Sequence, residues 1–154
     1  MDIFEAIKKR RSVRSFKKQQ IPDEIIEKIL DSGKRAPSAG NVHPEIFILI
    51  REQEVKDKIA NAALNQHFIS DAPVVIVACA DVEKSERSYG SRGRNLYCIQ
   101  DTAAAIENML LSATALGVGS CWVGAFNESK ISEILKLPEN VRPLAVIPLG
   151  YPGE

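Results

Sequence analysis

The first feature of the sequence that could bind a ligand is a cluster of positively charged residues close to its start. Seven cations and one hydroxyl group stand near one another: Lys8, Lys9, Arg10, Arg11, Ser12, Arg14, Lys17 and Lys18. Arginine guanidinium groups and a serine hydroxyl donate the hydrogen bonds that a phosphate group accepts. The same cations also suit the C-terminal end of a helix, where positive charge favours the helix dipole. The pattern alone leaves both interpretations open.

Other familiar catalytic patterns are missing from the sequence. It contains no GxSxG, GxGxxG or GxxxxGK motif, which excludes the commonest serine-hydrolase and phosphate-loop fingerprints. Cys79, Cys98 and Cys121 lie far apart without CxxC spacing, so neither a disulfide framework nor a zinc site is expected. We find no Asp or Glu at metal-ligand spacing from His43 or His67. We therefore expect no metal and no Cys–His catalytic pair.

Two loops rich in small residues are the remaining candidates for a binding site. They cover residues 37–41 and 117–124. Without bulky side chains, the main chain can approach a flat ligand closely. Together with the cationic segment, these loops favour a cofactor that carries its own reactivity, which the protein binds and orients.

The composition limits the class of protein. The chain has 154 residues, of which 45% are hydrophobic and 26% charged, and this is typical of one domain over residues 1–154. Twenty basic residues balance 20 acidic ones, which argues against nucleic acid as the main partner. No apolar run is long enough to cross a bilayer, and the N-terminus lacks the apolar core of a signal peptide. We expect a cytoplasmic protein with no membrane partner.

Hydrophobic periodicity predicts helices interleaved with about four strands, an α/β or α+β sandwich. Residues 97–116 are rich in alanine and apolar nearly all round, which predicts a buried central helix. Residues 73–80 are continuously apolar and predict a buried central strand. Asp23 is expected to cap the second helix, and the polar segment 81–95 to form a mobile surface loop or a partly helical lid. The other predicted helices cover 2–10, 23–33, 55–64 and 128–135, and the other strands 46–50, 120–123 and 141–149.

Five motifs together are more specific than any one of them. They are Arg10–Phe16, Ala36–Pro44, Gln100–Ala105, Gly117–Phe126 and Pro148–Pro152. In this order and spacing they resemble the FMN-dependent nitroreductase family of NAD(P)H oxidoreductases over nearly the whole chain. The resemblance implies an α+β sandwich with a central, mostly antiparallel sheet flanked by helices. It also implies a homodimer that holds FMN at each subunit interface.

The resemblance assigns the phosphate end of FMN to the cationic segment. Arg10, Arg11 and Ser12 of one subunit are expected to bind the phosphate and the ribityl chain. Arg14 is expected at the pyrimidine edge of the flavin, near N1 and the C2 carbonyl. A fixed cation there favours the negative charge that N1 carries in reduced FMN. The alternative for Arg14 is a surface ion pair.

The partner subunit is expected to line the same flavin with Pro37, Ser38, Ala39 and Asn41. These residues would also suit a plain helix-to-strand turn, which is the alternative interpretation.

Residues 122–125 are expected to cover one face of the flavin. A backbone N–H of Gly124 or Ala125 would point at flavin N5, which requires a small residue, although Gly124 could also simply end a strand. Trp122 is included as a contact, although an aromatic residue at a strand end also suits the core. Asn65 is expected near the polar edge of the ring, or else as a solvent-facing helix residue. No side chain is assigned as catalytic, because the chemistry resides in FMN.

Two features depart from the family pattern. Family members commonly continue past the Gly-Tyr-Pro turn at residues 150–152 with a tail that brings Lys or Arg to the FMN phosphate, whereas this sequence ends at Glu154. The phosphate is therefore expected to rest on the N-terminal arginines alone, with weaker retention of the cofactor. Phe68 stands where some relatives place a lysine near the flavin. Gln100 and Asp101 are expected to cap the long helix or brace the dimer rather than touch FMN.

The activity that the resemblance implies is transfer of a hydride from NADH or NADPH, through flavin N5, to a small acceptor. A nitroaromatic, a quinone, a free flavin or an enone would serve. Two alternatives stay open: a flavin-binding protein without turnover, and a specialised relative that cleaves reduced flavin or removes halogens reductively.

Overall fold

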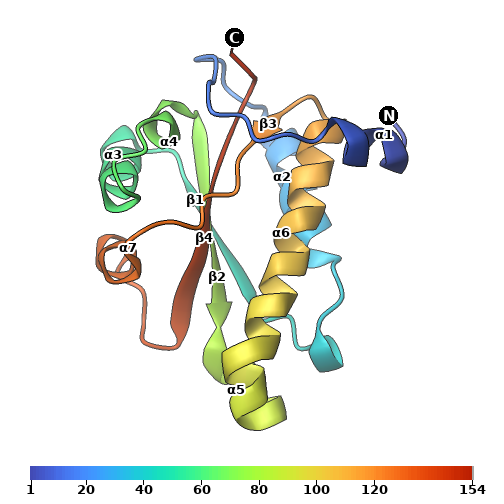
Figure 1. Ribbon diagram of the computed structural model, residues 1–154, viewed down its shortest axis with the longest axis vertical. Helices are drawn as coiled ribbons and strands as arrows, with labels where there is room; N and C mark the ends of the chain where they lie inside the picture. The colour runs from blue at the N-terminus through green and yellow to red at the C-terminus, as the bar shows by residue number, and fades with distance from the viewer. Residues whose placement is uncertain (154) are drawn as a thin grey trace.

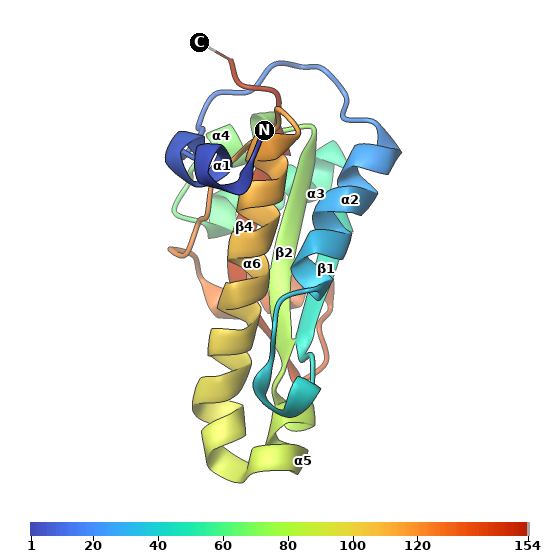
Figure 2. The same ribbon diagram turned by 90° about the vertical axis from the view of Figure 1, so that its right-hand side faces the viewer.

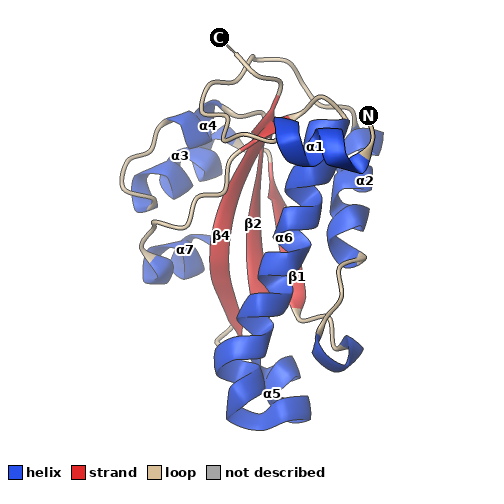
Figure 3. Cartoon of the chain, turned by 45° about the vertical axis from the view of Figure 1, so that its right-hand side comes forward, coloured by secondary structure: helices blue, strands red, loops and turns tan. Residues whose placement is uncertain are grey.

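The computed structural model describes residues 1–153 and has a sheet between two layers of helices (Figures 1 and 3). Four antiparallel strands follow the order β1 (Glu45–Ile50), β2 (Val74–Asp81), β4 (Val141–Gly150) and β3 (Gly119–Ser120). One face carries α1 (Ile3–Lys9), α2 (Asp23–Lys34) and α6 (Cys98–Ala115). The other carries α3 (Gln53–Ala62), α4 (Phe68–Asp71) and α7 (Glu128–Leu135). The predicted α+β sandwich with a mostly antiparallel sheet is confirmed.

The central strand β2 is apolar throughout because helices cover both of its faces. Val74, Ile76 and Ala78 join the core under α2 and α6. The alternate residues Val75, Val77 and Cys79 join the core under α3 and α7. Side chains of a strand point to opposite faces in turn, so a strand between two helical layers needs an apolar residue at every position. The prediction of a buried central strand is correct, and the continuous pattern arises here in an antiparallel sheet.

Helix α6 is the long helix that the sequence predicts, but it is buried on one side only. Ile106 and Met109 are each 1% exposed and pack against α2 and the sheet. A Cβ at Gly33 of α2 would lie 2.8 Å from Met109 Cγ, so glycine permits the close approach of the two helices. On the outer side, Ala104 and Leu111 are only partly buried. Figure 2 shows this outer side of α6 facing the viewer.

The polar segment after β2 folds as a helix. It forms α5 (Val82–Arg92), followed by a π-helical turn over Gly93–Tyr97 that leads into α6. The Asp81 side chain accepts a hydrogen bond from the Lys84 backbone N–H at 3.2 Å and caps α5. Of the two expectations for residues 81–95, the helical one is therefore correct.

Two local predictions differ from the structure. Asp23 does not cap α2, since its carboxylate instead accepts a hydrogen bond from Arg51 at 2.7 Å. The strand predicted over 120–123 ends at Ser120. Beyond it, Val123 pairs with Val146 of β4 only as an isolated bridge.

Candidate cofactor site

The cationic segment runs in extended form across one end of the sheet. The Val13 backbone N–H donates to the Ser120 carbonyl at 2.8 Å, and the Val13 side chain is buried at 4% exposure. With Val13 turned inward, its neighbours Ser12 and Arg14 are exposed. Arg11 is also exposed. The backbone of this segment is thus fixed to β3 while its polar side chains face outward.

The structure separates the two interpretations of the cation cluster. Lys8 and Lys9 lie in the last turn of α1, where they suit the helix dipole. Arg11 and Arg14 lie beyond that helix, and among residues 1–153 neither of them forms an ion pair. Helix capping therefore explains the lysines but leaves the arginines available for an external anion.

A small hollow lies beside the cationic segment at the C-terminal end of α6. Its volume is about 190 Å³, and Lys9, Arg11, Thr114 and Ser120 are among the residues that line it. Complete ligand pockets usually measure roughly 300–1,000 Å³. The hollow therefore has the size of part of a site.

The segment that follows Ser120, a residue of the hollow, presents a small, open stretch of main chain. Trp122 is 41% exposed, so the alternative that placed it in the core is wrong. Gly124 and Ala125 are exposed as well. A Cβ built at Gly124 would meet no atom of residues 1–153 within 4 Å. The chain's own packing therefore does not require glycine there, and its absent side chain leaves the backbone open to a ligand.

The turn after α3 packs against the same open stretch. Gln66 donates from its side-chain amide to the Ala125 carbonyl at 3.2 Å and to the Ala63 carbonyl at 2.8 Å. Asn65 adopts a left-handed conformation with φ of 56° and is exposed. It is therefore a turn residue beside the open stretch, and its alternative as a helix residue is wrong. Nothing in the sequence singled out Gln66, which holds the turn in place.

The loop with Pro37, Ser38, Ala39 and Asn41 lies at the other end of α6. It contains a single 3₁₀ turn over Ala39–Asn41, in which Gly40 and Asn41 both have φ of 58°. A Cβ on Gly40 would collide with the hydroxyl of Tyr89 from α5 and would adopt a left-handed φ, so this position favours glycine. The loop does join α2 to β1, as the plain-turn alternative predicts. Its consecutive left-handed residues are however an uncommon conformation that surrounding contacts must stabilise.

Asp101 of α6 supplies one of those contacts. Its Oδ1 accepts a hydrogen bond from the Ala39 backbone N–H at 3.1 Å. The residue is 8% exposed, and its Oδ2 is buried without a hydrogen-bond partner in residues 1–153. Burial raises the pKa of this carboxyl group, while the Ala39 N–H lowers it. Asp101 therefore holds the loop, in place of the helix cap that the sequence suggested.

We expect Asp101→Asn to raise the free energy of unfolding at neutral pH by about 1 kcal/mol, because the amide oxygen still accepts from Ala39 while the buried charge is removed. The folded-state pKa lies above the ordinary value of 3.8, so folding favours the protonated acid. The stability of the parent protein therefore falls as the pH rises from 3.8 through the folded-state pKa. The advantage of the variant should be absent below pH 3.8 and complete above that folded-state pKa. Urea unfolding at a series of pH values measures it.

The matched control for this prediction is Glu107→Gln, on the exposed side of the same helix. It should leave the stability nearly unchanged across the same pH range. An Asp101→Asn protein that is less stable than its parent at neutral pH would contradict the prediction.

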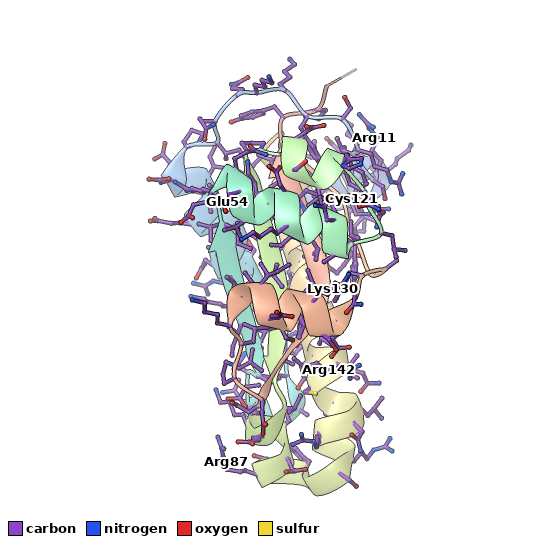
Figure 4. All side chains as sticks on the ribbon, turned by 90° about the vertical axis from the view of Figure 1, so that its left-hand side faces the viewer. Arg11, Glu54, Arg87, Cys121, Lys130 and Arg142 are labelled. Carbon is purple, nitrogen blue, oxygen red and sulfur yellow. The ribbon has the colours of Figure 1, made fainter. Side chains whose placement is uncertain are left out.

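The predicted site residues thus form two groups at opposite ends of α6. Arg11 lies near Thr114, whereas the 37–41 loop contacts Asp101, thirteen residues earlier on the helix and about 20 Å away along its axis. Figure 2 shows α1 and the cationic segment at one end of α6 and the 37–41 loop at the other. In Figure 4, Arg11 and Cys121 lie at the end opposite to Arg87 of α5. The first group is Arg10, Arg11, Ser12, Arg14, Asn65, Trp122, Gly124 and Ala125, and the second is Pro37, Ser38, Ala39 and Asn41.

The structure also places the cysteines and the candidate metal ligands of the described residues. All three cysteines are buried, and burial raises the pKa of Cys79 to about 12, which disfavours a reactive thiolate. Residues 1–153 contain no group of three or more His, Cys, Asp or Glu side chains that could hold a metal ion. Within the same residues, no helix is both long and apolar enough to span a bilayer.

Comparison with known proteins decides the family. The profile of the nitroreductase family matches residues 7–66 and 62–151. The chain belongs to the nitroreductase family. The resemblance inferred from the five motifs is thereby confirmed, and the matched residues include both groups of the candidate site.

Individual relatives of this nitroreductase-family chain agree with that assignment. A Methanothermobacter thermautotrophicus protein, provisionally named NADH dehydrogenase/NAD(P)H nitroreductase, is 40% identical over 100% of this chain and 79% of its own length. A Bacillus subtilis protein named FMN reductase (NADPH) is 27% identical over 98% of this chain and 66% of its own length. The crystal structure of a nitroreductase family protein from Clostridium novyi NT superposes with a TM-score of 0.92. It is 39% identical and covers 100% of this chain and 87% of that one.

Proposed function

We propose that this protein is an FMN-dependent oxidoreductase that takes a hydride from NADH or NADPH and passes it to a small oxidised acceptor. Nitroaromatics, quinones and free flavins are the acceptor classes we propose. The relatives support this proposal because their names include NAD(P)H nitroreductase and FMN reductase. The observation that carries the proposal is the first group itself. Its arginines form no ion pair within residues 1–153, and they flank Ser12, which pairs with Ser120 just before the open stretch of main chain.

The residues of the first group fit the parts of FMN in chemical type. Arg10, Arg11 and Ser12 offer charged and neutral donors for a phosphate. The uncovered backbone at Gly124 and Ala125 suits the close approach of a flat ring. When bound, FMN would supply the hydride-accepting atom N5. The chain would supply orientation, a backbone donor near N5 and the positive charge of Arg14 at the pyrimidine edge.

We propose further that two copies of the chain form each site. The apolar side of α1 is uncovered in the single chain, where Ile3, Phe4 and Ile7 are 56%, 78% and 54% exposed. A groove of about 420 Å³ between α1, α2 and α6 lies next to it. Exposed apolar surface of this kind is typical of a protein interface. A two-fold axis that sets two α6 helices antiparallel would bring the 37–41 loop of one copy to the arginines of the other.

The experiment that tests this function begins with the purified protein. We expect flavin absorbance, or its appearance after addition of FMN, together with the mass of a dimer in solution. We also expect steady-state oxidation of NADH or NADPH with a quinone as acceptor. Bound FMN without turnover would favour the non-catalytic flavin-binding alternative. A colourless monomer that does not bind FMN would refute the proposal.

A further inference from the structure

The loop that carries Asn41 contains a chain of polar contacts centred on His43. His43 Nδ1 lies 3.1 Å from Glu45 Oε1, and His43 Nε2 lies 2.7 Å from Asn41 Oδ1. The His43 backbone N–H also donates to the Ser38 hydroxyl at 2.9 Å. His43 itself has φ of 52°, so the ring is held close to the left-handed turn at Asn41. The function proposed above assigns no part to this histidine.

The two contacts of the ring constrain its protonation. Both Glu45 Oε1 and Asn41 Oδ1 are hydrogen-bond acceptors, and a neutral imidazole has only one N–H. With Asn41 Oδ1 toward Nε2, both contacts are hydrogen bonds only in the imidazolium form, in which both ring nitrogens donate. With a neutral ring, both contacts are hydrogen bonds only when the Asn41 amide is reversed, so that its NH₂ group donates to a bare Nε2.

The burial of Glu45 determines which ring nitrogen of His43 loses its proton. The Glu45 side chain is 5% exposed, and the His43 side chain is 34% exposed. A buried carboxylate is costly without a hydrogen-bonded partner, so Glu45 holds the proton on Nδ1 in both forms of the ring. The proton that leaves is then the one on Nε2, which faces Asn41.

We propose that His43 is a positioning residue that determines which end of the Asn41 side-chain amide is offered to the flavin. This inference rests on the proposed function, which places Asn41 at the cofactor. With the ring protonated, Asn41 Oδ1 is bound by His43 and the exposed NH₂ group donates to a carbonyl or ring nitrogen of the flavin. With the ring neutral, the amide is reversed and offers a carbonyl, which can only accept. One proton on His43 thus exchanges a donor for an acceptor at the site.

Other ionisable groups surround this loop and must be separated from His43 in any pH experiment. Glu45 of β1 touches the ring directly. Lys84 of α5 donates from Nζ to the His43 carbonyl at 3.2 Å. Tyr89 of α5 lies against Gly40, and Asp101 of α6 holds Ala39. Only Glu45 and Asn41 contact the ring nitrogens among the described residues, so the Asn41 amide is the direct reporter of the proton on Nε2.

The first test uses the protein without flavin. In ¹⁵N NMR spectra recorded across a pH series, we expect the Asn41 side-chain NH₂ resonances to shift with the same midpoint as the His43 ring nitrogens. In His43→Gln, the Asn41 resonances should lose this pH dependence, while in the control His67→Gln they should keep it. Asn41 resonances that stay constant while His43 titrates would overturn the proposal, and this result needs no variant to fold.

The second test measures FMN affinity on both sides of the His43 midpoint. The FMN phosphate also loses a proton at about pH 6, so the wild type is compared with His43→Gln, whose side-chain NH₂ remains a donor to Asn41 Oδ1 at every pH. We expect the wild-type affinity to change about three- to tenfold more than that of His43→Gln across the same pH range, the effect of one hydrogen bond. Equal changes in the two proteins would overturn the role at the flavin. Failure to bind FMN at any pH would instead refute the proposed function. The NMR test would still stand, because it uses the protein without flavin.

Discussion

Replacing Arg10 and Arg11 together by alanine should strip FMN from the protein and leave the fold intact. Both residues lie beyond the packed part of α1, and Arg11 lines the hollow at the end of α6. A hydrogen bond to a charged group contributes about 1.5–3 kcal/mol, so the loss of two should weaken FMN binding by about 100-fold or more. Quenching of flavin fluorescence during titration measures the affinity, and thermal unfolding checks the fold.

The matched control for this variant is Lys17→Ala with Lys18→Ala. It removes the same charge from the same cationic segment, and both lysines are exposed. These lysines should affect FMN binding only through long-range attraction of the phosphate, which salt screens over about 8–10 Å. Affinity should therefore fall only a few-fold at low salt and hardly at physiological salt. An equal loss in both double variants would show that net charge, rather than a phosphate site, governs binding.

Elements whose pattern reflects their immediate surroundings could be predicted from the sequence. The unbroken apolar run in β2 predicts burial on both faces, and both faces are covered. The alanine-rich stretch 97–116 predicts α6 correctly within a few residues. Its partly exposed outer side could not be distinguished, because alanine suits both a packed core and a surface that another chain covers. Composition carries no information about which neighbour covers a face.

The positions of the site residues could be predicted only in part. Motif order identified the family and supplied both groups of candidate residues, but contacts between distant positions fix their conformation. Asp101 holds Ala39 from 62 residues away, and Gln66 reaches Ala125 across 59 residues. Even the pair His43 and Glu45, two residues apart, was not identified as a contact. It forms because His43 adopts a left-handed backbone that periodicity does not predict.

A mixing experiment should show that each site is built from two chains. We expect chains with Arg10→Ala and Arg11→Ala to lack the phosphate contacts. Chains with Ala39→Trp should lack the loop contacts, because the bulky ring fills the space that we propose the loop leaves for the flavin. Neither variant alone should retain FMN. After unfolding and refolding of an equal mixture, half of the dimers should contain one chain of each kind.

In such a mixed dimer, one site combines both defects and the other combines the intact arginines with the intact loop. About a quarter of all sites should therefore regain FMN, as expected for two equivalent sites related by a two-fold axis. A control mixture of the arginine double variant with Arg14→Ala should regain none, because both chains then carry the defect in the same group. The two groups lie at opposite ends of α6 in the single chain, about 20 Å apart, so recovery requires a second copy to bridge them. If the first mixture regained no more FMN than the control, each site would have to be built within one chain, and the exposed side of α1 would need another explanation.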